Sequence, residues 1–276
     1  MHMAGESLRI LVLGAHPDDA EFHAGGLMLR YLAAGHHVKV VSVTDGSAGH
    51  HRLDREQLIA ARRAEADAVR SLIGIEYDIW GFPDGQLQPT LEVRHRIIQE
   101  IRRFQPDLVL THRPCDYHPD HRAVGLAVQD ASYMVTVPLI APDTPALRRD
   151  PVVAYMVDLF VRPYPFCADI VLDVGPQFPG IIGMLDCHAC QVYEWLPYNL
   201  GILDQVPDDA QQRRGFLSHW FGSRLRTIAD RFREALVRDY GPIRGKSIEM
   251  AEAYEISEYA RPLDAESRAR LFPFVP

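Results

Sequence analysis

The sequence predicts an α/β fold: a doubly wound, mostly parallel sheet with helices on both faces and a C-terminal elaboration. Short apolar runs alternate with longer amphipathic segments over roughly the first 111 residues, which is the pattern of repeated βαβ units. Hydrophobic residues make up 47% of the 276 residues, so a sizeable core can form. No apolar run is long enough to span a membrane.

The strands are expected where short apolar runs end in Gly, Pro or Asp. These runs are residues 8–13, 38–43, 77–80 and 107–111. Helices are expected between them, because apolar residues recur at helical spacing in residues 24–32, 55–73 and 91–104. Each crossover should be right-handed, and in the common strand order 3-2-1-4 the first and fourth strands are neighbours. The loops after those two strands should therefore lie close together.

The second half of the chain carries a weaker pattern. Its segments predict a loop at 137–146, strands at 152–160 and 170–174, a mostly helical stretch at 178–195 and a long charged helix at 213–240. No repeat or linker is evident, so one domain is expected over residues 1–276. Within it, residues 1–135 would form a Rossmann-like core, and residues 136–276 would shape the rim of the substrate site.

Charge and cysteine content narrow the functional class. The net charge of −8 argues against a broad nucleic-acid surface. Residues 1–7 are polar, and the apolar run after them is too short for a secretion signal, so a cytoplasmic protein is expected. Four cysteines are too few for a disulfide framework. Cys187 and Cys190 form a C-x-x-C pair, but no thioredoxin-like unit is evident, which favours structural thiols. The sequence is compatible with a homo-oligomer and does not require one.

The first candidate site lies on the turn after the first strand. His16, Asp18, Asp19 and Glu21 fall within six residues there. Either aspartate could cap the following helix. Capping needs one carboxylate, however, and does not explain a histidine with further carboxylates beside it. A metal or acid/base site is the alternative.

A second cluster follows the fourth strand. It contains another His-Pro-Asp unit at 118–120, followed directly by His121. Two matching clusters that are predicted to meet at one edge of the sheet favour a metal site. Imidazole and carboxylate groups suit zinc, Fe(II) or Mn(II), and the lack of an obvious thiolate set argues against a closed structural zinc site. A catalytic site would use three protein ligands and leave other groups for acid/base chemistry.

These motifs resemble the paired signatures of the LmbE-like (PIG-L) de-N-acetylases. The resemblance rests on Ala-His-Pro-Asp-Asp at 15–19 and His-Pro-Asp-His at 118–121, and extends to Thr-Asp-Gly at 44–46, Arg-Arg-Ala-Glu at 62–65, Pro-Asp-Gly at 83–85 and, weakly, residues 250–254. Many members have Glu directly after the second Asp, whereas here Ala20 precedes Glu21. Members of this family use a metal to remove the acetyl group from N-acetylglucosamine units of small conjugates.

The resemblance implies a role for each matching residue. It implies that His16, Asp19 and His121 bind zinc, that Asp18 is the general base, that His118 stabilises the oxyanion or acts as general acid, that Asp120 orients His118, and that Arg62 holds the sugar. The negative charge of Asp120 should in addition raise the pKa of His118.

The predicted function is therefore a zinc-dependent hydrolase that removes the acetyl group from an N-acetylglucosamine-type conjugate by metal-activated water. An amidase of a thiol-sugar conjugate and a non-catalytic, metal-binding Rossmann-like module are the alternatives. A nucleotide-binding module is disfavoured, because no G-x-G-x-x-G follows the first strand. Tyr193, Trp195 and Tyr198 could stack on a sugar, although aromatic residues on helices more often belong to the core.

Overall fold

A seven-stranded sheet organises the structure, a computed structural model that describes residues 7–276. The strand order is β3-β2-β1-β4-β5-β7-β6. The strands are β1 (Arg9–Gly14), β2 (His37–Thr44), β3 (Glu76–Phe82), β4 (Leu108–Thr111), β5 (Val152–Met156), β6 (Ile170–Asp173) and β7 (Ala251–Ile256). The expectation that there is no secretion signal rests partly on residues 1–7, of which only Ser7 lies within the described residues.

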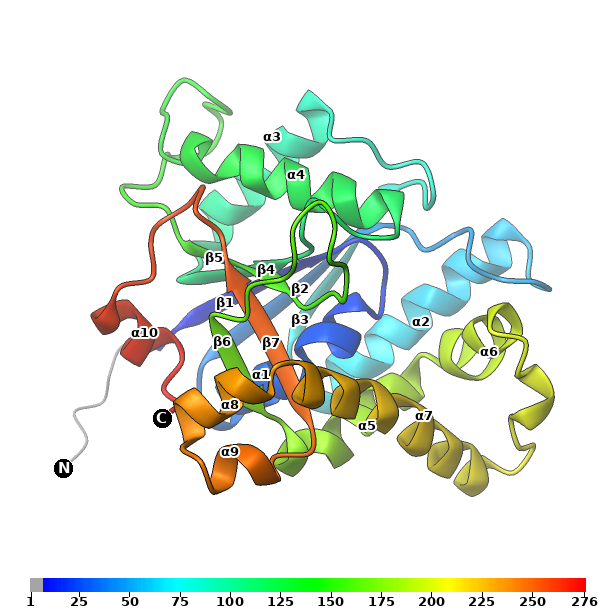
Figure 1. The fold of residues 1–276 in the computed structure, drawn as a ribbon. Coiled ribbons are helices and arrows are strands. Elements are labelled where there is room, and N and C mark those ends of the chain that lie inside the picture. Colours follow the sequence, from blue (N-terminus) through cyan, green and yellow to red (C-terminus); the bar gives the residue numbers. More distant parts are fainter. Residues whose placement is uncertain (1–6) are drawn as a thin grey trace.

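The first five strands are parallel, and the predicted order 3-2-1-4 is confirmed. β1 pairs with β2 on one side and with β4 on the other, with Ile10 opposite Leu108 in the latter pair. The carboxyl ends of β1 and β4 therefore meet at one edge of the sheet. The predicted fold class, a mostly parallel α/β sheet covered by helices, is confirmed as well (Figure 1).

β7 is a strand that the sequence analysis did not expect. It lies between β5 and β6 and is antiparallel to both. Its apolar run is interrupted by Glu252, a buried carboxylate that accepts hydrogen bonds from the backbone N–H groups of Gly26 and Leu27 in the first helix. The sequence pattern did not predict this strand because an acidic residue interrupts it, and the hydrogen bonds to α1 are what allow Glu252 to be buried.

Helices cover both faces of the sheet (Figure 1). They are α1 (Asp19–Ala33), α2 (Arg55–Ile73), α3 (Leu91–Phe104), α4 (Pro119–Met134), α5 (Phe178–Cys187), α6 (Leu196–Asn199), α7 (Ala210–Arg231), α8 (Arg233–Tyr240), α9 (Arg244–Ser247) and α10 (Ala265–Leu271), with short 3-10 turns at Gly175–Gln177 and Leu203–Gln205. Alternate residues of β1 face the two cores. Ile10 and Val12 pack in the core that holds α1, α2, α5 and α7, and Leu11 and Leu13 pack in the core beneath α3 and α4.

Local sequence signals explain several helix ends. Asp54 and Gln57 form a capping box at the start of α2, and Gly74 ends that helix in the left-handed conformation (φ 73°). Thr90 caps α3 through its side chain. No helix of the described residues is both long and apolar enough to cross a membrane.

The helices of the second half are shorter than the sequence predicted. The stretch 178–195 breaks at His188 and continues as a π-helix at Cys190–Trp195. The stretch 213–240 is divided at Phe232 into α7 and α8. A redox C-x-x-C motif lies at the start of a helix, whereas Cys187 is the last residue of α5. The buried Cys190 thiol donates a hydrogen bond to Glu65, as a structural thiol would. The thiols of both cysteines are free.

Candidate metal centre

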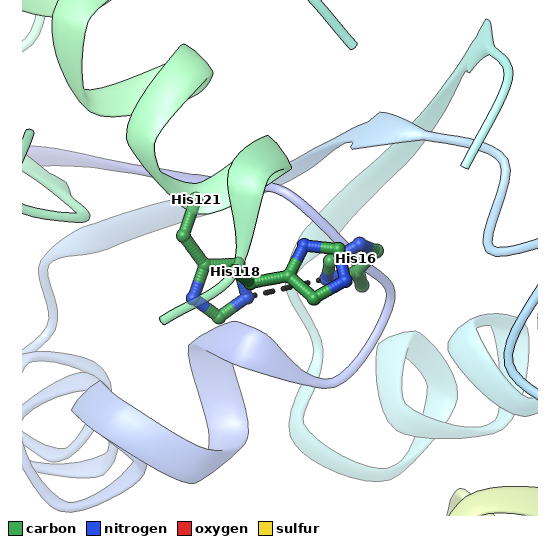
Figure 2. A group of neighbouring side chains, drawn as sticks. All are labelled: His16, His118 and His121. Atoms are coloured by element: carbon green, nitrogen blue, oxygen red, sulfur yellow. Dashed lines mark hydrogen bonds between the residues drawn. The ribbon is translucent and has the colours of Figure 1, made fainter. Parts of the chain in front are cut away.

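Two turns at the carboxyl edge of the sheet carry the histidines of the two motifs. His16 lies between β1 and α1, His118 is the N-cap residue of α4, and His121 lies in the first turn of that helix. Figure 2 shows the three rings gathered together. His121 Nε2 lies 3.3 Å from His16 Nδ1, although these residues are 105 positions apart in the chain. The adjacency of β1 and β4 brings the two turns into contact.

Asp19, the first residue of α1, completes the group of three predicted ligands. Its Oδ1 lies 3.4 Å from His121 Nε2, and its Oδ2 lies 3.6 Å from His16 Nδ1. In a tetrahedral zinc site with bonds of about 2.0–2.1 Å, neighbouring ligand atoms are about 3.3 Å apart. The two histidine nitrogens, 3.3 Å apart, are therefore spaced as zinc ligands would be, and Asp19 meets each of them through a different oxygen. The backbone N–H groups of Ala15 and His16 hold the Asp19 carboxylate at 2.8 and 2.7 Å.

Three further carboxylates contact the far side of the two imidazole rings. Asp84 Oδ1 and Asp120 Oδ2 lie 3.1 and 3.4 Å from His16 Nε2. Asp116 Oδ1 lies 3.1 Å from His121 Nδ1. Each ring thus directs one nitrogen to the shared point and the other to a carboxylate, which is the usual environment of a metal-bound histidine.

His112, the residue after β4, offers another potential ligand. Its Nε2 lies 3.0 Å from Asp19 Oδ2, and Asp19, His112 and His121 are close enough to hold a metal ion together. However, the rings of His112 and His121 are stacked, with centroids 3.8 Å apart and planes at 14°. Stacked rings direct their lone pairs side by side rather than toward one point. The stacking disfavours joint coordination of one ion by His112 and His121, and the contact with Asp19 Oδ2 places His112 to support Asp19.

Asp18 lies beside the ligands but has a different environment. It precedes α1, yet its side chain makes no capping hydrogen bond, so the helix-capping interpretation of this residue is wrong. Its backbone has φ 132° and ψ −21°, a conformation that only glycine adopts without strain. The carboxylate lies 3.2 Å from the Arg62 guanidinium. Burial raises the pKa of Asp18, and the charge of Arg62 opposes that rise.

His118 is held in an orientation that keeps one ring nitrogen unprotonated. Its Nδ1 accepts a hydrogen bond from the backbone N–H of Asp120 at 3.2 Å, which leaves Nε2 as the N–H donor in the neutral ring. Burial, together with the charges of His16 and His121, lowers the pKa of His118. The charge of Asp120 raises this pKa, as expected, but burial outweighs that effect, so the expected net rise is wrong.

Asp120 contacts other groups than the expected one. Its carboxylate accepts hydrogen bonds from the backbone N–H groups of Gly85 and Leu87 at 2.7 and 3.1 Å and contacts His16. Only its backbone N–H reaches His118. The expectation that the Asp120 carboxylate orients His118 is therefore corrected: the helix turn orients that ring, and the carboxylate acts on His16.

Arg62 and Glu21 also differ from what the motifs suggested. Arg62 is buried in the cavity wall, where its guanidinium contacts the Pro17 carbonyl and the Asp18 carboxylate. Its partners in the structure are thus protein groups, foremost the carboxylate of Asp18. Glu21 is fully buried on the far side of α1, and its Oε1 lies 3.4 Å from His188 Nε2. It does not line the cavity.

A cavity of about 600 Å³ opens over the cluster, within the range of small-molecule sites. Part of its lining is apolar and comes from α1, the π-helix, α6 with the residue after it, and α7: Phe22, Trp195, Leu196, Leu200 and Trp220. Trp195 is the one member of the aromatic trio 193, 195 and 198 that lines it. Tyr193 is buried and donates to Asp186, and Tyr198 stacks on His51 at 4.0 Å.

Three functional candidates escaped the sequence analysis as site residues. Asp84 was quoted only as part of a turn motif, and Asp116 and His112 only as part of the loop after the fourth strand. Each is a His or Asp within five residues of the carboxyl end of a strand, and that proximity was the available signal. The pairing of Asp84 with His16 required the tertiary structure, because 68 positions separate them in the chain.

The family model described as GlcNAc-PI de-N-acetylase (PIG-L) matches residues 11–132. Residues 11–132 form a PIG-L family domain. This domain runs from β1 into α4 and contains all the histidines and aspartates of the metal centre described above.

Curated relatives of the PIG-L domain differ in the reactions that their names give. Diacetylchitobiose deacetylase of Thermococcus kodakarensis is 30% identical over 132 residues, which cover 45% of this chain and 49% of the relative. A 1D-myo-inositol 2-acetamido-2-deoxy-alpha-D-glucopyranoside deacetylase of Mycolicibacterium smegmatis is 27% identical over 68% of this chain and 81% of its own. A 4-oxalmesaconate hydratase of Pseudomonas putida is 24% identical over 68% of this chain and 76% of its own. The chain spans about half the length of the first of these relatives.

The fold also matches solved structures over nearly the whole chain. N,N'-diacetylchitobiose deacetylase of Pyrococcus horikoshii superposes with a TM-score of 0.69 at 21% sequence identity, covering 92% of this chain and 85% of that one. At this identity the likeness establishes the shared fold, including the part of the sheet that follows the PIG-L domain.

Proposed function

We propose that the protein is a zinc-dependent N-deacetylase that acts on an N-acetylated amino sugar conjugate. The observation that carries the proposal is the clustering of His16, Asp19 and His121 beside the carboxylate of Asp18. His16 Nδ1 and His121 Nε2 lie 3.3 Å apart, and each lies within 3.6 Å of an Asp19 oxygen. Three nitrogen and oxygen ligands and an adjacent acid/base group are the parts of a catalytic metal site.

Zinc fits these residues better than a metal that requires only oxygen ligands, because two of the three ligands are imidazoles. The contacts of His16 and His121 with Asp84, Asp120 and Asp116 would keep both rings directed toward the ion. A bound zinc ion supplies Lewis-acid activation of water and of the amide carbonyl.

The side chains around the ion would divide the proton transfers between them. Asp18 takes the proton of the attacking water, and its raised pKa moves it toward the pH at which a general base works well. His118, as a neutral ring, donates from Nε2 to the oxygen that gains negative charge. Arg62 holds Asp18 in place and lies close enough to the cavity to meet the sugar.

The substrate class rests on the relatives and on the cavity. Two of the relatives are named as deacetylases of acetylated amino sugars. The apolar lining includes Trp195 and Trp220, and indole rings are suitable platforms for a sugar. We assign the rim to residues 136–276, as part of one domain with the core. The free thiols fit our placement of the enzyme in the cytosol.

Water addition to an activated double bond is the second candidate, because one relative is named as a hydratase. Both reactions need activated water and a stabilised anionic oxygen. They differ in their products, since only deacetylation releases acetate and a free amine.

The test is acetate release from a panel of N-acetylated amino sugar conjugates by the zinc-loaded protein. We expect zinc at about one ion per chain, activity that chelation abolishes and added zinc restores, and a loss of about 10²–10⁴-fold in Asp18→Ala with its zinc retained. Asp116→Asn is the comparison variant, because it should weaken zinc binding about 10–100-fold and recover activity at higher zinc concentration. Absence of acetate release together with hydration of an unsaturated acid would replace the proposal with the second candidate.

A further inference from the structure

Arg224 is an arginine of the cavity wall that comes from α7, outside the PIG-L domain. Its guanidinium makes one side-chain contact, 3.2 Å to His23 Nδ1, and its Nε is buried without a hydrogen-bond partner. It forms no salt bridge with any of residues 7–276. The side chain therefore brings a positive charge and unused N–H groups to the cavity.

Three buried arginines of this protein have carboxylate or backbone carbonyl partners. Arg62 pairs with Asp18, and Arg113 forms two 2.7 Å bonds to the Asp158 carboxylate. Arg102 donates to a set of backbone carbonyls that includes those of Val135 and Thr144. Partial burial of a guanidinium without such partners is unfavourable, because lost hydration is not replaced. The fold tolerates this arrangement at Arg224, the one of these four arginines that has neither a carboxylate nor a backbone carbonyl as a hydrogen-bond partner among residues 7–276.

The position of Arg224 relates it to the metal centre. His23, its contact, lies with its ring centroid 6.5 Å from that of His121. Trp220 precedes Arg224 by one helical turn, and both line the cavity. A ligand with its acetamido group at the zinc ligands and its sugar against Trp220 would direct a substituent toward the guanidinium.

We propose that Arg224 binds an anionic group of the substrate, a carboxylate or a phosphate, so that the enzyme selects acidic N-acetyl amino sugars over neutral ones. Planar N–H groups of arginine match both anions in geometry and charge. This inference rests on the proposed deacetylase function for the sugar, whereas the anion preference itself rests on Arg224.

The test compares three substrates that differ in charge: N-acetylglucosamine, its 6-phosphate, and N-acetylmuramic acid, which carries a carboxylate. Zinc-loaded wild type should deacetylate at least one of the acidic substrates with a kcat/KM about 10-fold or more above that of N-acetylglucosamine. Arg224→Gln should lower that kcat/KM about 10–100-fold, the usual loss for a charged hydrogen bond, and leave the neutral substrate within about threefold. If Arg224→Gln loses kcat/KM for the 6-phosphate, the bound group is a phosphate; if it loses kcat/KM for N-acetylmuramic acid, the bound group is a carboxylate.

Arg226→Gln is the matched control, because it removes the same charge from the same helix at a residue that does not line the cavity. It should leave all three substrates unchanged. An equal loss for acidic and neutral substrates in Arg224→Gln, or no loss at all, would overturn the proposal.

Binding of the deacetylated products separates this inference from the function itself. Calorimetry of zinc-loaded protein with glucosamine, glucosamine 6-phosphate and muramic acid needs no turnover. Tighter binding of an acidic product that Arg224→Gln abolishes would support the anion site even if no acetate is released. Equal binding of all three products by wild type would refute it even if deacetylation is observed.

Discussion

Replacement of Asp18 by glycine and by alanine should separate its chemical role from its backbone strain. The residue has φ 132°, where a side chain with a Cβ is strained by about 1–3 kcal/mol. Glycine relieves that strain, but its greater freedom in the unfolded chain costs about 0.5–1 kcal/mol relative to alanine. Both variants lose the contact with Arg62, so that loss cancels in the comparison. The midpoints of these two ranges predict that Asp18→Gly is about 1 kcal/mol more stable than Asp18→Ala.

This difference is large enough to measure by thermal unfolding. An unfolding entropy of about 2.1 cal/mol/K per residue converts it to about 2 °C in Tm for a chain of this length. Both variants should retain zinc, as measured by elemental analysis, and both should lose deacetylase activity to the same extent. An alanine variant as stable as the glycine variant would refute the argument that the active-site turn is strained. Loss of zinc from both would show that Asp18 is a ligand instead.

Three further predictions concern protons. His118→Ala should lose about 10²–10³-fold in kcat at every pH from about 6.5 to 8.5, because a ring whose pKa is lowered is already neutral there. If the kcat of wild type instead falls above pH 7 and the variant lacks that fall, His118 acts as a protonated acid. In the metal-free protein, Asp19 and Asp116 overcome the effect of burial and raise the pKa of His121 to about 9, so zinc uptake at pH 7 should release at least about one proton. Calorimetry in two buffers of different ionisation enthalpy measures the number of protons released. Zinc binding without proton release would contradict the prediction. Burial raises the pKa of Glu252 from 4.5 to about 7, so its stabilising contribution is complete below pH 4.5 and is lost as the pH rises to 7. In urea unfolding, the free energy of unfolding of wild type should fall by about 3 kcal/mol over this interval, and that of Glu252→Gln should lack this fall. The same pH dependence in both proteins would refute the prediction.

Periodicity in the sequence was sufficient for the first half of the fold. Strands β1 to β4 and helices α1 to α4 have apolar residues at spacings that a parallel sheet and its crossovers require, and the handedness rule leaves few strand orders. The first and fourth strands therefore met as expected, and with them His16 and His121. The PIG-L motifs sit on the turns that this topology brings together, which is why the candidate site was accessible from sequence.

Only the tertiary structure decided the details that depend on distant partners. β7 contains Glu252, whose burial is tolerated because backbone N–H groups of α1 and the hydroxyl of Tyr254 donate hydrogen bonds to it. The local sequence does not indicate that α1 supplies these partners. The break at His188 likewise places that ring between Glu21 and Glu65, which lie on two other helices.

The sequence by itself determined the fold class, the edge of the sheet that carries the site, and the residue types gathered there. The structure decided which groups face each other: Asp120 contacts His16 rather than His118, Asp18 pairs with Arg62, and Arg224 lies in the cavity wall without a carboxylate partner among residues 7–276. Helical and strand periods are local properties that each segment carries. Side-chain contacts within 4 Å depend on how segments that are distant in the sequence pack against one another, and only the folded chain determines that packing.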